Sequence, residues 1–195
     1  FQDGEPFVLR EDVRIVAQEG LLREAAFLKD YLFETVGKEF PVVTKLQKGE
    51  RGISLSVSSK VTQREGYILI VDKKHISIEG GSAAGVFYGI QTLRKSLDAD
   101  ANLVPVVIKD APRFSWRGMH LDCSRHFFPV SFVKKYIDLL ALHQMNVFHW
   151  HLTDDQGWRI EIRKWRNLID VGSHRTGTII GTNSDIDDEK PYGGY

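Results

Sequence analysis

Residues 116–162 hold the pattern that most restricts what this chain can fold into. Two strand-like segments, residues 119–124 and 146–154, flank a segment whose apolar residues recur at helical spacing. Parallel strands need a crossover of a dozen or more residues between them, and that crossover is usually a helix. The order strand, helix, strand therefore predicts two neighbouring parallel strands of an α/β fold.

Chemically active side chains are concentrated near the end of each of these strands. Residues 122–126 (DCSRH) close the first strand, and residues 154–159 (DDQGWR) follow the second. In parallel α/β folds, ligands bind at the carboxyl ends of the strands, where loops can vary over a fixed scaffold. We therefore expect the functional site at this end of the two strands.

The alternation along both strands separates an apolar face from a partly polar one. The apolar face is predicted to contain Met119, Leu121, Cys123, Phe148, Trp150 and Leu152. The other face is predicted to contain His120, Asp122, Ser124, Val147, His149 and His151. Such a division suits barrel strands that pack on helices outside and approach a reaction centre inside.

The connecting helix is predicted to have Ser131 as its N-cap and to bury one stripe of side chains. That stripe contains Val133, Tyr136, Ile137 and Leu140. Cys123 is predicted to be a small core residue, because it lies on the apolar face without a basic neighbour. Trp150 and Trp165 are expected to pack rather than to bind a ligand.

The preceding part of the chain has a different order of elements. Strands are predicted at residues 12–17, 52–58, 67–72 and 75–79, and helices at residues 21–36 and 83–97. This order predicts an α+β domain whose sheet carries both helices on one face. We place its end near Ala111 and Pro112, so that residues 1–111 form one domain and residues 112–195 begin a second.

Gly80 and Gly81, just before the second of these helices, allow two interpretations. They could cradle an anion at the N-terminus of the helix. A tight turn from strand to helix is the plainer interpretation.

Charge and hydropathy argue against several classes of partner. Lys plus Arg and Asp plus Glu both number 26, so no net field favours nucleic acid or an anionic membrane surface. No apolar run approaches the roughly 18 residues of a membrane span. The single cysteine allows no internal disulfide. The chain opens on Phe1 without a signal-like segment, and we expect an exported protein, periplasmic or extracellular, whose leader is absent here.

Several segments together resemble a known family. They are residues 117–122 (RGMHLD), 124–127 (SRHF), 146–152 (NVFHWHL) and 154–159 (DDQGWR). In this order they resemble the opening of the catalytic barrel of family 20 glycoside hydrolases, the β-N-acetylhexosaminidases. Residues 85–93 (GVFYGIQTL) resemble the last helix of the small α+β domain that precedes that barrel in the family.

The resemblance implies a retaining hydrolysis of terminal β-linked N-acetylglucosamine or N-acetylgalactosamine. The substrate's own 2-acetamido group is then the nucleophile, and no cofactor takes part. In the family, an Asp-Glu pair on the fourth strand of a (β/α)8 barrel supports this reaction. Such a barrel takes roughly 250 residues and only about 80 follow Phe114. We therefore expect an amino-terminal fragment that contains the start of the barrel, lacks the catalytic pair and is inactive alone.

The resemblance also suggests roles for two charged residues. Arg125 matches the arginine that holds hydroxyls of the non-reducing sugar, a task that suits its planar, permanently charged fork of donors. The alternative is an arginine that pairs with Asp122 to fix the loop. Asp154 matches the aspartate that contacts the catalytic glutamate and helps to raise the pKa of that acid. The alternative is a simple turn aspartate.

His149 and His151, two residues apart on a strand, project from the same face. From spacing alone they could form half of a metal site, completed by Asp154 or Asp122. The rival interpretation is a hydrogen-bonded polar layer that also includes His120 and Asp122. Because the family uses no metal, the resemblance favours the polar layer.

Residues 176–195 are rich in Gly, Thr, Asp and Asn, which predicts a long loop. A second function remains open beside the glycosidase, namely a non-catalytic carbohydrate-binding or scaffold segment. A barrel that is incomplete would leave apolar faces uncovered, so we also expect self-association.

Overall fold

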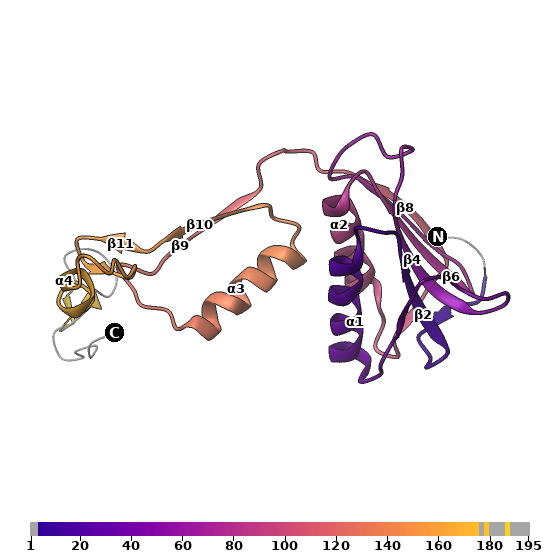
Figure 1. Cartoon of the computed structure of the whole chain (residues 1–195), viewed down its shortest axis with the longest axis horizontal. Coiled ribbons are helices and arrows are strands. Elements are labelled where there is room, and N and C mark those ends of the chain that lie inside the picture. Colours follow the sequence, from indigo (N-terminus) through magenta and orange to yellow (C-terminus); the bar gives the residue numbers. More distant parts are fainter. Residues whose placement is uncertain (1–3, 176–177, 180–185, 188–195) are drawn as a thin grey trace. The chain divides into compact units, whose positions relative to one another are not determined.

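The computed structural model describes residues 4–175, 178–179 and 186–187, and the chain divides into two compact units, Phe1–Ser115 and Trp116–Tyr195 (Figure 1). The boundary expected near Ala111 and Pro112 falls close to this division. Within the described residues, no helix is both long and apolar enough to cross a membrane.

The first unit is built on a mixed six-stranded sheet (Figure 1). In spatial order its strands are β3 (Val42–Val43), β2 (Val13–Ala17), β4 (Arg51–Val57), β6 (His75–Gly80), β5 (Tyr67–Val71) and β8 (Val106–Asp110). The β3, β2, β4 and β6 strands run parallel, whereas β5 is antiparallel to both β6 and β8. A separate antiparallel pair joins β1 (Phe7–Val8) to β7 (Asn102–Leu103).

Two helices, α1 (Leu22–Val36) and α2 (Ala83–Ser96), cover one face of this sheet, as the sequence predicts (Figure 1). The first helix ends at Gly37, whose φ of 69° is left-handed and whose N–H donates to the Phe33 carbonyl at 2.8 Å. The second begins after Ser82, whose hydroxyl accepts the N–H of Ala84 at 3.2 Å. The apolar stripes of both helices and the covered face of the sheet form one continuous core.

The β5–β6 hairpin turns over Lys73 and Lys74, neither of which favours turns. The carboxylate of Asp72 accepts the N–H of Lys74 at 2.7 Å and of His75 at 2.8 Å. Asp72 also donates its own N–H to the His75 carbonyl at 2.9 Å. The aspartate thus supplies the turn chemistry that the two lysines lack.

Gly81 and Gly85 mark a place where two backbones meet. A Cβ at Gly81 would overlap the carbonyl of Gln63, and a Cβ at Gly85 would overlap the carbonyl of Gly66. The N–H of Gly81 donates to Gly66 O at 3.0 Å. These glycines allow the start of α2 to pack directly on the loop before β5, which agrees with the tight-turn interpretation.

The second unit contains the predicted strand–helix–strand arrangement. The strands β9 (Gly118–Asp122) and β10 (Val147–His151) pair in parallel, with Asp122 opposite His151. The helix α3 (Val130–Leu142) connects them (Figure 1). The core of the second unit consists of Leu121, Cys123 and Val133, with Phe128, Tyr136, Phe148 and Leu152 packed against them.

Two predictions about α3 are wrong. Pro129, not Ser131, is the N-cap, and its carbonyl accepts the N–H groups of Phe132 and Val133 at 2.9 and 3.2 Å. Its ring fixes φ at −67°, so the chain enters the helix from there without any side-chain cap. Ile137, expected in the buried stripe, is 45% exposed, because a two-stranded sheet is too narrow to cover the edge of the stripe.

Short elements complete the second unit. The strands β11 (Thr153–Asp154) and β12 (Gly157–Trp158) pair antiparallel, and α4 (Asn167–Asp170) follows. The loop predicted over residues 176–195 lies mostly outside the described residues. Where it is described, the prediction is corrected, because β13 (Thr178–Ile179) and β14 (Ile186–Asp187) form a short antiparallel pair.

Candidate functional site

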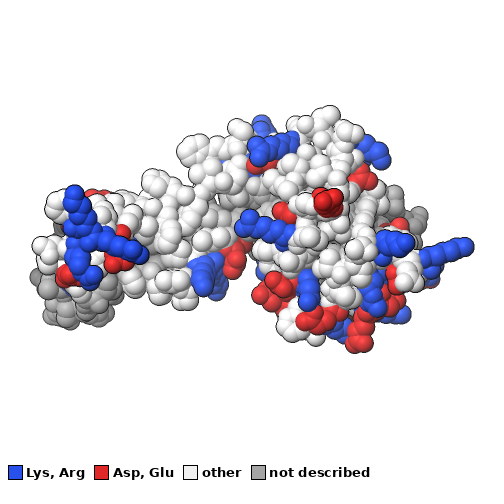
Figure 2. Space-filling view, viewed as in Figure 1, with Lys and Arg blue, Asp and Glu red and all other residues white. Residues whose placement is uncertain are grey.

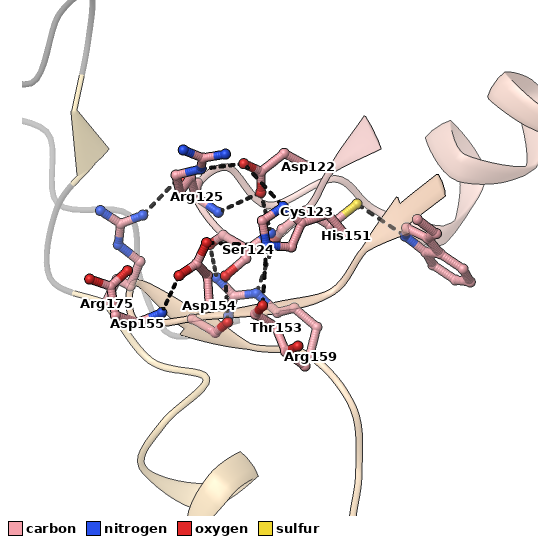
Figure 3. Close-up of polar contacts among 12 residues, drawn as sticks. Asp122, Cys123, Ser124, Arg125, His151, Thr153, Asp154, Asp155, Arg159 and Arg175 are labelled. Carbon is pink, nitrogen blue, oxygen red and sulfur yellow. Dashed lines mark hydrogen bonds and ion pairs between the residues drawn. The ribbon is translucent and has the colours of Figure 1, made fainter. Parts of the chain in front are cut away.

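The charged residues predicted from the sequence meet where β9 and β10 end (Figure 3). Both strands are parallel and in register, so their carboxyl ends lie at the same edge of the small sheet. The turn after β9 brings Asp122 and Arg125 to this edge, and the turn after β10 brings Asp154. Parallel pairing therefore places together groups that are separated by about 30 residues in sequence.

Asp122 fixes the turn that follows β9. One carboxylate oxygen accepts the N–H groups of Ser124 at 2.9 Å and Arg125 at 3.0 Å, and the other oxygen accepts the Nε–H of Arg125. Burial favours a raised pKa for Asp122, but the hydrogen bonds from Arg125 and Ser124 and the charge of Arg125 outweigh it, so the pKa is lowered. Asp122 is therefore a charged anchor for Arg125.

Arg125 keeps free donors beside this anchor. Its side chain is 55% exposed, and only Nε is bonded to a side chain, that of Asp122. Within the described part of the chain, neither Nη group has a hydrogen-bond partner. The hydrogen bond and charge of Asp122 raise the pKa of Arg125, with smaller contributions from the charges of Asp154 and Asp155. The two interpretations of Arg125 are compatible, because the Asp122 pair leaves the outer donors available.

Asp154 is joined to the same group of residues through His151. Nε2 of His151 lies 3.2 Å from the Asp154 carboxylate and 3.1 Å from the Thr153 carbonyl, and Nδ1 lies 3.8 Å from the Asp122 carboxylate. The backbone N–H of Asp155 donates to Asp154 at 2.9 Å and is the main cause of a lowered pKa for Asp154. Arg125, Asp122, His151 and Asp154 thus form one connected polar group (Figure 3).

The three histidines lie on one face, as the alternation predicts. The ring centroids of His120 and His149 are 4.7 Å apart, and those of His120 and His151 are 5.6 Å apart. Among the described residues, no three His, Cys, Asp or Glu side chains are arranged to hold a metal ion. The three rings contact one another, and of these three side chains only that of His151 has a hydrogen bond within the described residues, to Thr153 O. The choice between a metal site and a hydrogen-bonded layer stays a prediction.

The opposite face holds Cys123, which is buried as expected. The Nε1–H of Trp150 donates to its sulfur at 3.2 Å, and the Trp150 ring stacks on Phe148 with centroids 5.9 Å apart. Trp165 does not pack as predicted, because its side chain is 60% exposed beside Lys164. Ser124 is also not on the polar face, because β9 ends at Asp122 and the alternation stops there. It is buried and donates its hydroxyl hydrogen to Gly157 O at 2.6 Å.

Sequence reasoning did not identify two further arginines. Arg159 donates to the carbonyls of Cys123 at 3.2 Å, Ser124 at 3.3 Å, and Ser173. Arg175 donates to the carbonyl of Arg125 at 2.6 Å (Figure 3). The presence of Arg159 in the DDQGWR segment was the available signal, but nothing in that spacing shows that its side chain turns back to the end of β9.

Two family descriptions match the sequence. "Glycosyl hydrolase family 20, domain 2" matches residues 1–111, and "Glycosyl hydrolase family 20, catalytic domain" matches residues 114–193. The two matched segments are in the order that the resemblance of the motifs implies.

Curated proteins and solved structures point the same way. A beta-hexosaminidase of Porphyromonas gingivalis is 41% identical over 83% of this chain and 22% of its own length. A beta-N-acetylhexosaminidase of Cellulomonas fimi is 36% identical over 92% of this chain and 37% of its own. The structure of the GH20 beta-N-acetylhexosaminidase of Streptomyces coelicolor A3(2) is 33% identical with a TM-score of 0.77, covering 99% of this chain and 39% of that one. The chain thus spans well under half the length of these relatives.

Proposed function

The chain belongs to glycosyl hydrolase family 20, and from this we propose that the protein carrying it is a β-N-acetylhexosaminidase that releases terminal β-linked N-acetylglucosamine or N-acetylgalactosamine. The main structural support is the meeting of Arg125 and Asp154 at the ends of two neighbouring parallel strands. The names of the relatives support the same assignment.

In this proposal, Arg125 binds hydroxyl groups of the terminal sugar. Its Nη groups are exposed donors, and the bond from Nε to Asp122 fixes the plane of the guanidinium. Holding the sugar in one orientation aligns its 2-acetamido oxygen for attack on the anomeric carbon, which forms a bond to that carbon as the leaving group departs. A protein carboxylic acid donates the proton that the leaving oxygen takes up.

Asp154 serves that acid indirectly. An aspartate is negatively charged at neutral pH, and the N–H of Asp155, which lowers the pKa of Asp154, favours that charged form further. A fixed negative charge near a second carboxyl group raises the pKa of the second group, which then still holds a proton when the glycosidic bond breaks. The His151 ring lies between the two carboxylates, with Nε2 3.2 Å from Asp154 and Nδ1 3.8 Å from Asp122.

We further propose that residues 112–195 are the start of a (β/α)8 barrel whose catalytic Asp-Glu pair lies outside these 195 residues. The parallel pair β9 and β10 with its connecting helix supplies only the first step of such a barrel. The chain alone would then bind a sugar weakly and hydrolyse nothing.

The experiment compares this chain with the product of the complete reading frame. Both are assayed with nitrophenyl β-glycosides of N-acetylglucosamine and N-acetylgalactosamine. We expect turnover by the complete product and none by the isolated chain. Absence of activity in the complete product would refute the hexosaminidase, and native-like activity in the isolated chain would refute the placement of the catalytic pair.

Arg125→Gln tests the role of Arg125 in the complete product. Loss of hydrogen bonds to a charged donor should raise KM about 10- to 100-fold. The matched control is Arg163→Gln, an exposed arginine of the same unit, which should leave KM unchanged. Equal KM values for the Arg125 variant and the wild type would contradict sugar binding by Arg125.

A non-catalytic carbohydrate-binding segment is the competing function. It predicts that the complete product binds N-acetylglucosamine in calorimetry but shows no turnover of either nitrophenyl glycoside. A metal-dependent hydrolase that uses His149 and His151 predicts activity that is lost on treatment with a chelator. We expect the hydrolysis to be insensitive to chelators.

Two further expectations concern the state of the protein. Because apolar side chains such as Phe132 and Leu139 are exposed on α3, we propose that the isolated chain self-associates, and light scattering that shows a monodisperse monomer would refute this. We also propose that the protein is exported, which fractionation of the source cells would test.

A further inference from the structure

In the turn that presents Arg125, three consecutive backbone carbonyls accept hydrogen bonds from side chains. Those of Cys123, Ser124 and Arg125 follow the last residue of β9, where the strand ladder no longer supplies donors. Ser124 is fully buried, so a carbonyl left without a donor there would be costly. Two guanidinium groups provide the donors.

Arg159 serves the first two carbonyls. Its Nε–H donates to Cys123 O at 3.2 Å, and Nη2 donates to Ser124 O at 3.3 Å. Nη1 donates to Ser173 O, on the segment that follows α4. Only a guanidinium offers this many donors in a fixed plane. The side chain of Arg159, which directly follows β12, therefore joins the turn after β9 to the segment near Ser173.

Arg175 serves the third carbonyl. Its Nη1 donates to Arg125 O at 2.6 Å (Figure 3). Arg175 lies two residues after Ser173, which is itself held by Arg159 and by a hydrogen bond from its hydroxyl to Ile169 O at 2.6 Å. By binding the Ser173 carbonyl, Arg159 therefore also fixes the backbone next to Arg175, whose side chain donates to the Arg125 carbonyl.

We propose that Arg159 and Arg175 are positioning residues that fix the backbone of residues 123–125 and thereby aim the Arg125 guanidinium at the substrate sugar. This inference rests on the proposed function for its substrate but on the backbone contacts alone for its geometry. Asp122 holds the amides of the turn and the two arginines hold its carbonyls, so the turn is fixed from both sides.

The kinetic test uses the complete gene product and a double-mutant cycle. Arg159→Gln should raise KM about 10-fold with little change in kcat, because only sugar binding by Arg125 is disturbed. In an Arg125→Gln background the same change should raise KM less than about 2-fold, because Arg159 acts through Arg125. Equal effects in both backgrounds would overturn the proposal.

The conservative variant separates geometry from charge. Arg159→Lys keeps the charge, but its three N–H donors share one nitrogen and cannot reproduce the planar fork that reaches the three carbonyls from three nitrogens, so it should behave like Arg159→Gln. Full recovery of KM by Arg159→Lys would show that charge alone matters and would overturn the proposal.

A second readout needs no substrate and no turnover. Hydrogen exchange of the Ser124 and Arg125 amides should become about 10-fold faster in Arg175→Gln than in the Arg163→Gln control, because the turn loosens when a carbonyl loses its donor. Unchanged exchange would overturn the positioning role. A wild-type protein without hexosaminidase activity would instead overturn the proposed function, and the exchange rates would still decide the role of Arg175.

Discussion

The two units of the chain have similar patterns of apolar residues, but the apolar side chains are buried to very different extents. Across residues 4–175, where burial is described, every buried hydrophobic residue other than Leu121, Cys123 and Val133 lies in the first unit. In the second unit, apolar residues of the strands and of α3 such as Met119, Trp150 and Leu139 are more than 40% exposed. In Figure 2, uncharged residues dominate the visible part of the second unit between its ends.

The difference follows from the number of elements that pack together. In the first unit, a six-stranded sheet and two helices enclose a complete core. In the second, a two-stranded sheet carries one helix, and such a sheet covers only a narrow stripe. Alternation in a sequence therefore predicts which side chains share a face, whereas burial depends on what covers that face.

The strongest test of this difference in burial is to truncate an isoleucine side chain in each unit. Ile78→Ala empties a fully buried site on β6 and should lower the unfolding free energy of the first unit by about 3–4 kcal/mol. Ile137→Ala, on the exposed edge of α3, should cost less than about 1 kcal/mol.

Fluorescence can assign each loss to its unit, because all four tryptophans lie in the second unit. Denaturant unfolding followed by tryptophan fluorescence reports the second unit, while far-UV circular dichroism is dominated by the first. Ile78→Ala should shift the dichroism transition alone. A fluorescence midpoint that moves by the same amount would show that the two units unfold together and would break the comparison.

A glycine pair sharpens the same point with a smaller effect. Gly81→Ala places a Cβ against the Gln63 backbone, which cannot move aside, and should destabilise the first unit by about 2 kcal/mol. Gly118→Ala places a Cβ against the side chain of Trp116, which is 68% exposed and free to rotate. We expect a shift within about 0.5 kcal/mol for Gly118→Ala, measured by the same two probes.

Sequence patterns predicted the long regular elements well. The α1 helix ends at Gly37 and the alternating segments became β2, β4, β5, β6, β9 and β10. The strand β8 was not predicted, because the segment VVIKD lacks alternation and is extended through pairing with β5, from Val71 opposite Val106 onwards. The two-residue strands β1, β3 and β7 also depend on distant partners and carry no local signal.

The candidate site was predictable only in part. Asp122 and Arg125 are three residues apart, so a turn between them could be expected from the sequence alone. The carbonyls of Ser124 and Cys123 lie 35 and 36 residues from Arg159 and that of Ser173 lies 14 away, and no periodicity reports such contacts. The charged side chains of the site could therefore be named in advance, whereas the arginines that hold the backbone beneath them could not.

Low pH should destabilise the second unit more than the first, and this is the smallest of the expected differences. The pKa of Asp122 is lower in the folded second unit than in the unfolded chain, so folding is favoured most when this group is charged. The stabilisation is complete above the ordinary aspartate pKa of about 3.9 and is lost as the pH falls below it toward the folded pKa. The free energy of unfolding of the second unit, measured by fluorescence, should therefore fall across this pH range.

Asp122→Asn tests whether Asp122 causes this dependence of stability on pH. The amide cannot gain a charge, so the variant should be less stable at neutral pH and should lose less stability in acid. Asp138→Asn, which alters an exposed aspartate of α3, is the matched control and should keep the wild-type slope. If both variants lose stability in acid equally, the hydrogen bonds of the turn do not depend on the charge of Asp122. The second unit would then be held by its small apolar core rather than by the polar group at its strand ends.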